Sequence, residues 1–360
     1  MTRPKRNVTK NGWIIVAVLT TCIALVSFFL HIERSNLDGY LGMSLPAGFK
    51  IFNENSPWNT PICENAETDP NSDLMIQNLI ESLVSLGRTP NLGINYKEWT
   101  SPIHVIDADK SPKVDVRTTD PLGQLYESVD PDHDGIAEDI PLPDGCWPDP
   151  SNDGHMILVD PYKRVCWEFS IAHKLGPGKW EASIIDKWDL NGPGYREPFS
   201  GKYWWRSGAR GSGCPFIAGL IRPEEIEAGE INHALAIATP INRKKISDEA
   251  KWEYELCSPP ASRTDGSGIG PEYVPEGARL QLNPNLDLDA LGISEDAKTV
   301  ARAMQQYGIF VVDCGAGFSL YFQNLGPDGG KWQEHPGLAD ITKIPVSELR
   351  VLKCNIVVKE

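Results

Sequence analysis

The distribution of hydrophobic residues divides the chain into one long apolar segment near the N-terminus and a region of many short elements. Residues 72–86 and 294–307 repeat apolar side chains at intervals close to 3.6, so both ranges are predicted to be helices. Ser294 and Gly308 have the residue types that cap the two ends of the second helix. A third, short helix is predicted to begin at Pro223, because proline favours the first helical position.

Between the helices the apolar period falls to about two, with β-branched and aromatic residues in short runs, which is typical of strands. The predicted strands are 155–160, 164–170, 180–186, 234–239, 278–282, 309–313 and 318–323. Short connections predict that the first two form a hairpin and that the last two form another. Many short strands without alternating helices predict a mostly β fold, a β-sandwich or jelly roll with two or three helices.

Residues 13–30 contain no charged side chain and would measure roughly 27 Å as a helix, close to the ~30 Å of a bilayer core. Basic residues precede this segment, so the positive-inside rule places the N-terminus in the cytoplasm. The alternative is a cleaved signal peptide, but the run is long for one and no A-x-A site follows it. We expect a cytoplasmic basic tail (1–12), a transmembrane signal-anchor (13–30), a linker (31–50) and a single exported β-rich domain (51–360) of a single-pass cell-membrane protein.

Charge and cysteine content fit an exported protein. The formal net charge is −15, which gives no support for nonspecific binding to nucleic acid or to anionic lipid. Of the 8 cysteines, all but Cys22 follow the apolar segment, where an oxidising compartment allows disulfide bonds. At most three bonds can form among them, and the sequence leaves their pairing open. No cysteine or histidine spacing indicates a zinc site.

The first predicted hairpin carries candidate acid–base chemistry. Asp153 and His155 stand at the start of one strand, where an imidazole can act as base or acid, or can simply cap a turn. On the partner strand Glu168 follows Trp167, and a carboxylate beside an indole ring can hold and hydrolyse a sugar. Alternatively Glu168 faces solvent. The second carboxylate of a hydrolase is expected to be Asp153, Asp186 or Asp189.

A second group of candidates follows the glycine-rich block at 208–215. In a lyase, His155 or His233 would serve as the base, and Arg222 or Arg279 would neutralise a uronate carboxylate. His233 can also be a core histidine that bonds the backbone. Two glutamates after Pro223 are explained by the helix dipole alone. No serine lies in a G-x-S-x-G motif, so a nucleophile elbow is not indicated.

An acidic loop predicts a possible calcium site, with carboxylates at alternate positions before a glycine: Asp130, Asp132, Asp134 and, further on, Asp139. The sequence is no EF-hand, because Pro141 stands where the twelfth-position glutamate is expected. The alternative is an acidic loop that binds no ion. Calcium is the only cofactor that the sequence suggests.

Tryptophan is unusually frequent, with 11 residues in the chain. Tyr203, Trp204 and Trp205 lie in a polar, glycine-rich stretch, and together with Trp167 they are candidates for stacking on sugar rings. The alternative is that tryptophans fill the space between packed sheets.

Several blocks occur in a fixed order: DGH at 153–155, GLIRPEEI at 219–226, HAL at 233–235, GARL at 277–280 and YG-x-x-VVD at 307–313. On these blocks the chain resembles a family of exported microbial proteins with no assigned activity, over about residues 50–325. The resemblance implies a secreted, mostly β protein and nothing about a reaction.

These features together predict a membrane-anchored extracytoplasmic protein that acts on carbohydrate. The expected activity is that of a polysaccharide-degrading glycoside hydrolase or lyase, with a polysaccharide or glycan as partner and no nucleic acid. The alternative is a noncatalytic surface protein that binds glycans for adhesion.

Overall fold

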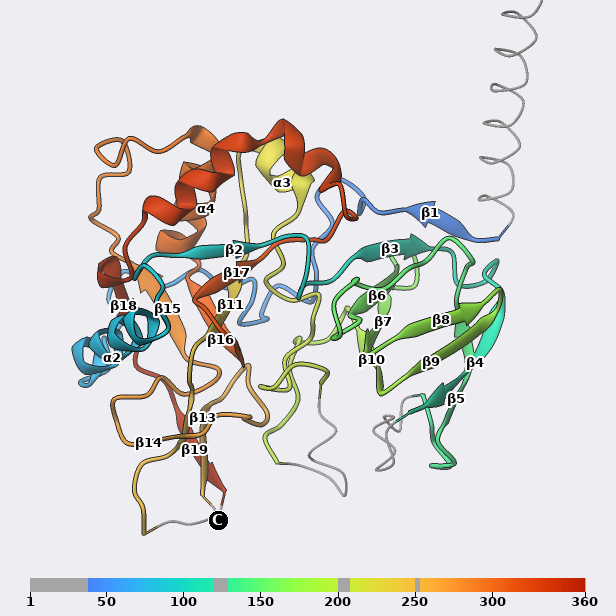
Figure 1. Ribbon diagram of the computed structural model, residues 1–360, viewed down its shortest axis with the longest axis horizontal. Coiled ribbons are helices and arrows are strands. Elements are labelled where there is room, and N and C mark those ends of the chain that lie inside the picture. The colour runs from blue at the N-terminus through green and yellow to red at the C-terminus, as the bar shows by residue number, and fades with distance from the viewer. Residues whose placement is uncertain (1–37, 120–128, 200–207, 250–252, 360) are drawn as a thin grey trace, which may run out of the picture.

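Figure 1 shows a computed structural model of the protein, which describes residues 38–119, 129–199, 208–249 and 253–359. The mostly β fold is confirmed, and the described residues contain three α-helices: α2 (Ser72–Ser85), α3 (Pro223–Ala228) and α4 (Glu295–Gln306). The predicted transmembrane segment at 13–30 lies outside the described residues. Within them, no helix combines the length and the apolar character needed to cross a membrane.

Two sheets packed face to face form the first region, which lies to the right in Figure 1. A five-stranded sheet has the order β1-β3-β6-β7-β10, with strands β1 (Tyr40–Gly42), β3 (Ile103–Ile106), β6 (Met156–Asp160), β7 (Val165–Ser170) and β10 (Ile184–Asp189). A four-stranded sheet has the order β5-β4-β9-β8, with strands β5 (Ile136–Pro141), β4 (Lys113–Thr118), β9 (Lys179–Ala182) and β8 (His173–Gly176). Leu158 and Phe169 of the first sheet share a buried cluster with Val116 and Trp180 of the second.

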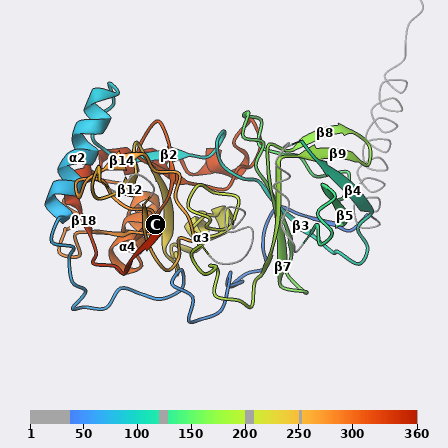
Figure 2. The same ribbon diagram turned by 90° about the horizontal axis from the view of Figure 1, so that it is seen from below.

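A six-stranded sheet and the helices form the second region, which both views place beside the first (Figures 1 and 2). Its order is β18-β15-β16-β11-β17-β2, with strands β18 (Leu349–Val351), β15 (Arg279–Leu282), β16 (Ile309–Cys314), β11 (Leu235–Thr239), β17 (Ser319–Tyr321) and β2 (Gly93–Asn95). Along β16, Ile309 and Val311 join a core that includes residues of α2 and α4. Phe310 and Val312 point the other way, into a cluster shared with β6 and β7. Both faces of β16 are therefore buried, each in a different hydrophobic cluster.

One predicted hairpin is confirmed and the other is wrong. β6 and β7 pair antiparallel, with Asp160 opposite Val165. β16 and β17 are separated by β11, which runs parallel to β16 and antiparallel to β17. Every residue of β11 is buried, so the backbone groups along both of its edges need hydrogen-bond partners. Its position between β16 and β17 provides a partner strand on each side.

The sheets are mixed. Parallel pairs join β3 to β6, β11 to β16 and β17 to β2, whereas a jelly roll consists of antiparallel strands. The predicted strand at 180–186 is also divided, because its first part lies in β9 and its second part in β10, which belong to different sheets.

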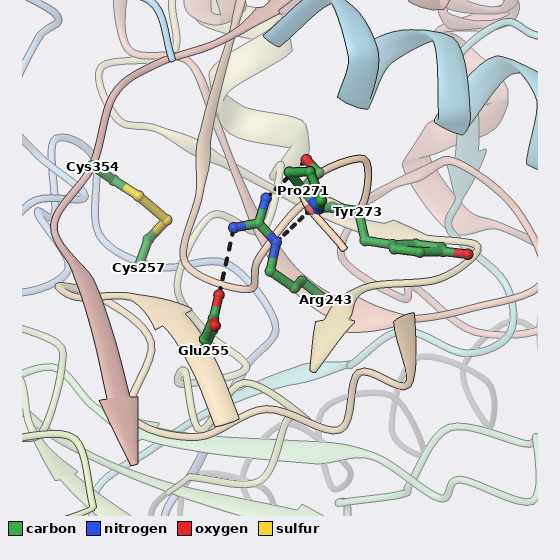
Figure 3. The surroundings of a disulfide bond; sticks show 6 residues. All are labelled: Arg243, Glu255, Cys257, Pro271, Tyr273 and Cys354. Atoms are coloured by element: carbon green, nitrogen blue, oxygen red, sulfur yellow. Dashed lines mark hydrogen bonds and ion pairs between the residues drawn. A yellow bond between two sulfur atoms is a disulfide. The ribbon is translucent and has the colours of Figure 1, made fainter. Parts of the chain in front are cut away.

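Two short sheets lie near the C-terminus, one pairing β12 (Arg243–Lys245) with β14 (Gly268–Ile269) and the other pairing β13 (Tyr254–Cys257) with β19 (Ile356–Lys359). A disulfide bond joins Cys257 to Cys354 (Figure 3). Beside it, Arg243 Nε donates to the carbonyl of Tyr273 (2.9 Å), and its guanidinium faces the Glu255 carboxylate (3.7 Å). Short 3₁₀ helices occupy Gly330–Glu334, Pro336–Lys343 and Val346–Glu348.

Candidate functional site

A loop at residues 208–219 lies between the five-stranded and six-stranded sheets and carries a buried arginine. Arg210 is 2% exposed, and its guanidinium donates to the carbonyls of Ala218 (3.1 Å) and Phe216 (3.0 Å). The same guanidinium lies 4.8 Å from the centroid of the Tyr321 ring, which belongs to β17. The loop closes tightly, since a Cβ on Gly208 would lie 2.0 Å from the Gly213 carbonyl. Arg210 therefore fixes the fold of this loop from inside.

Glu168 of the five-stranded sheet also holds this loop. Its Oε1 accepts the N–H of Ile217 (2.9 Å) and its Oε2 accepts the indole N–H of Trp188 (3.1 Å). Burial raises the pKa of Glu168 to about 7, although the N–H groups of the loop favour the charged form. The side chain is 0% exposed, so the expectation that it faces solvent is wrong. Trp167, on the other face of β7, is also buried, with the Lys187 ammonium 5.5 Å from its ring centroid.

Asp186 lies directly opposite Glu168 in the register of β7 and β10. Its two oxygens accept from Arg196 at 2.7 Å each, and its pKa is raised by burial, against which Arg196 acts. The two expected hydrolase carboxylates are thus neighbours. Neither has any exposed surface, so a polysaccharide cannot reach them in this arrangement, and their role is to join the loop and the sheet.

His155 is placed beside the same loop, with its ring centroid 4.2 Å from that of Phe216. Burial and, to a smaller extent, the charge of Arg210 together lower the pKa of His155 to about 3. The imidazole is therefore neutral near pH 7 and is a weak general base there. Burial also raises the pKa of its neighbour Asp153. The structure thus brings His155 and Glu168 to one loop but makes His155 unsuited to the expected role.

Three carboxyl groups and a thiol meet beside this loop, where the parallel strands β11 and β16 both end. Ligand atoms of Asp265, Glu276 and Cys314 all lie within 4.8 Å of one another. Asp313, the residue before Cys314, accepts the N–H of Gly211 (3.1 Å) through Oδ1. A Cβ on Gly211 would lie 2.3 Å from Oδ2 of Asp265, so the Asp265 carboxylate packs against the same glycine. Asp265 and Asp313 are therefore adjacent.

The protonation of this acidic cluster is set mainly by burial. Burial and the neighbouring Asp265 raise the pKa of Asp313 to about 7, against the effect of Arg210. Burial, Asp265 and Asp313 hold the pKa of Glu276 well above its usual range. Asn242 fixes the cluster by donating to Glu276 Oε1 (3.0 Å) and to the Asp313 carbonyl (3.0 Å). Asp265 is exposed, which gives this cluster access to solvent. Proton donors and acceptors that exchange near neutral pH are the groups that general acid–base catalysis needs.

Within the residues that the structure describes, two groups of side chains have the donor atoms for a metal ion. One is Asp265, Glu276 and Cys314 of the acidic cluster. The other is the predicted calcium loop, in which the carboxylates of Asp130, Asp132 and Asp134 lie within 4.8 Å of one another. Asp130 also accepts the N–H of Asp134 (3.1 Å), so these contacts fold the turn as well. Asp139 lies in β5 and is absent from this group among the described residues, because the strand carries it away and its N–H donates to Asp115.

The predicted residues Arg222 and His233 meet at Glu225. Arg222 and His233 Nε2 (2.9 Å) both contact Glu225 Oε1, and His233 Nδ1 contacts the Ala234 carbonyl (2.9 Å). Against the cost of burial, the two cations lower the pKa of Glu225 to about 2. Glu225 therefore does more than complement a helix dipole. Arg279 is placed elsewhere, on β15, where it donates to the carbonyl of Tyr307 (2.7 Å) and packs on the Phe310 ring.

The tryptophans that the structure describes are mostly core residues. Trp58, Trp167, Trp180, Trp188 and Trp332 are buried, because indole rings fill the space between sheets, whereas Trp99 is 54% exposed. Tyr203, Trp204 and Trp205, the other predicted sugar-binding residues, lie outside the described residues.

Arg210, Asp265, Glu276 and Asp313 were not predicted as site residues. The sequence did contain an indication of Asp313 as a site residue, because it is a carboxylate at the end of the apolar strand 309–313. Asp265 and Glu276 lie in loops with no periodic pattern, so only the folded chain shows them together. No family model, no curated protein and no solved structure matches the chain.

Proposed function

We propose that the protein is a membrane-anchored extracytoplasmic glycan hydrolase that uses Asp313 and Asp265 as its acid–base pair. The observation that carries this proposal is the contact of both carboxyl groups with Gly211, at the point where β11 and β16 end. Asp313 is half-buried and has a pKa of about 7, whereas Asp265 is exposed. Two carboxyl groups in such different environments can serve as the acid and the base of one reaction.

In the proposed reaction, Asp313 donates its proton to the oxygen of the glycosidic bond as that bond breaks. A water molecule attacks the anomeric carbon and gives a proton to Asp265, so the proton count balances and one free reducing end appears. The cation of Arg210 opposes the rise in the pKa of Asp313, so this group can lose its proton within the neutral range. The raised pKa of Glu276 favours its neutral form, which adds no further charge to the cluster.

The hydrolase is favoured over the lyase that the sequence also allowed. A lyase needs a base and a cation for the uronate, but His155 is a weak base here, and Arg222 is engaged by Glu225. Arg279 is engaged by backbone carbonyls.

The test uses the purified full-length protein and a panel of neutral and acidic polysaccharides, with new reducing ends as the readout. Asp313→Asn and Asp265→Asn should each lower the rate at least a hundredfold, while Asp328→Asn, the same change at an exposed aspartate, should leave it unchanged. The rate should fall as the pH rises through about 7, because Asp313 then loses the proton that it donates. Full activity in both cluster variants, or no cleavage of any polysaccharide, would overturn the proposal.

The noncatalytic alternative, a surface glycan-binding or adhesion protein, gains support from a cavity beside Arg222 that is separate from the acidic cluster. Binding of a glycan by the wild type without any new reducing ends would make this the better description.

The membrane anchor at 13–30 and the calcium site remain part of the proposal. The Cys257–Cys354 disulfide is consistent with an oxidising, extracytoplasmic compartment. Calcium binding at Asp130, Asp132 and Asp134 is supported by the mutual distances of their carboxylates. Isothermal titration with calcium chloride, compared between the wild type and Asp132→Asn, checks it.

A further inference from the structure

A cavity of about 310 Å³ lies between residues 46–59 and helix α3 with the loop that follows it. Its apolar wall includes Phe52 and Trp58, and its polar wall includes Arg222, Glu224 and His233. A cavity of this size with an apolar surface and a few converging polar groups is the usual form of a small-molecule site. It shares no lining residue with the acidic cluster that contains Asp313.

Basic and acidic side chains are mixed around this cavity. The lining residues include three bases, Lys50, Arg222 and His233, and three acids, Glu224, Glu225 and Glu230. Both nitrogens of His233 are engaged, Nε2 by the Glu225 carboxylate and Nδ1 by the Ala234 carbonyl. Arg222 and His233 both contact Glu225, which leaves neither of them free to pair with an anionic ligand. The cavity therefore suits an uncharged ligand.

Two polar atoms at this wall have unused hydrogen-bonding capacity in the described part of the chain. Nε of Arg222 and Oε1 of Glu224 are buried without a hydrogen-bond partner, and they lie 4.0 Å apart. Arg222 as a whole is 6% exposed, so water does not satisfy its Nε. Burial raises the pKa of Glu224. The Glu224 side chain is 27% exposed, so its carboxyl group can turn toward the cavity.

We propose that this cavity binds a neutral, polyhydroxylated ligand of about the size of one hexose. A hydroxyl group can accept from Arg222 Nε and donate to Glu224 at the same time, which an apolar or purely anionic group cannot do. The apolar wall formed by Phe52 and Trp58 contacts the C–H face of the sugar ring. The choice of sugars as the class of polyol rests on the proposed function, but binding itself requires no hydrolysis.

The experiment titrates the full-length protein, in a detergent without a sugar headgroup, with glucose, galactose, mannose and glucuronate, and follows binding by saturation-transfer NMR and calorimetry. We expect at least one neutral hexose to bind, and glucuronate to bind at least tenfold more weakly. Glu224→Ala should weaken the binding of the hexose about tenfold, because the sugar hydroxyl then loses the oxygen that accepts its hydrogen bond. Glu224→Gln keeps an acceptor oxygen and should restore most of the affinity.

Glu227→Ala is the matched control, because Glu227 lies on the same helix, pairs with Lys331 (2.8 Å) and does not line the cavity. It should bind the hexose like the wild type. Asp313→Asn should also bind normally, which separates this proposal from the proposed hydrolysis. The proposal is overturned if no neutral hexose binds, if glucuronate binds as tightly as glucose, or if Glu224→Ala binds like the wild type while still folded by circular dichroism.

Discussion

The disulfide between Cys257 and Cys354 gives a stability prediction whose size follows from its place in the chain. The bond closes a loop with a sequence separation of 97, which in the chain-entropy account stabilises the folded state by about 4.7 kcal/mol. It also ties the C-terminal strand β19 to the protein beside its sheet partner β13, where Cys257 lies opposite Ile356. Loss of the bond should therefore lower the free energy of unfolding by several kcal/mol.

The assay is equilibrium unfolding in urea, followed by tryptophan fluorescence, of the wild type and the Cys257→Ala/Cys354→Ala double variant. With a slope of about 3 kcal/mol/M, a loss of this size lowers the midpoint by roughly 1.5 M. Mild reduction of the wild type should give the same shift, since it breaks the bond without removing the buried sulfur of Cys257. Cys63→Ala, at an exposed free cysteine, controls for the chemical change.

A shift of the midpoint smaller than about 0.3 M for both the double variant and the reduced wild type would refute this reasoning. Such a result would mean that the contacts of β13 and β19 hold the loop ends together in the unfolded ensemble as well, so that closure has no further effect.

Two smaller predictions concern single side chains. Ser294→Ala removes the hydroxyl that accepts the N–H of Ala297 (3.2 Å) at the start of α4, and should lower the free energy of unfolding by about 1 kcal/mol; an unchanged melting temperature would contradict the capping role. Arg196→Ala leaves the buried Asp186 without its ion pair and should destabilise the protein by about 2 kcal/mol at pH 7.5, less than for a fully buried pair because Arg196 is partly exposed. The loss of unfolding free energy relative to the wild type should be smaller at pH 5, because Asp186 without Arg196 takes up a proton more readily as the pH falls. Urea titrations that give an equal loss at both pH values would rule this out.

Sequence pattern alone located the three α-helices and eight of the nineteen strands that the described residues form. The helices predicted at 72–86 and 294–307 are α2 and α4, and Ser294 is the N-cap, because capping and the 3.6-residue period are properties of adjacent residues. The strands at 155–160 and 164–170 pair as predicted, since a short connection leaves few other partners. Where neighbours along the chain are also neighbours in space, the sequence determines the structure.

Long-range packing decided the rest. The sequence could not show that β11 separates β16 from β17, because periodicity reports that a strand is buried but not which strands lie beside it. The same limit explains why Glu168 is enclosed: burial of both faces of β7 depends on a sheet and a loop that come from other parts of the chain.

The acidic cluster is the clearest example of the difference between what local sequence determines and what long-range packing determines. Its carboxylates come from separate segments, Asp265, Glu276 and Asp313, and a fourth segment brings Gly211 between two of them. The sequence by itself determined the residue types and the local elements that hold them. Only the tertiary structure placed these carboxyl groups together and withdrew Glu276 and part of Asp313 from water. That burial raises the pKa of Asp313 and of Glu276 and makes the cluster a candidate for acid–base chemistry.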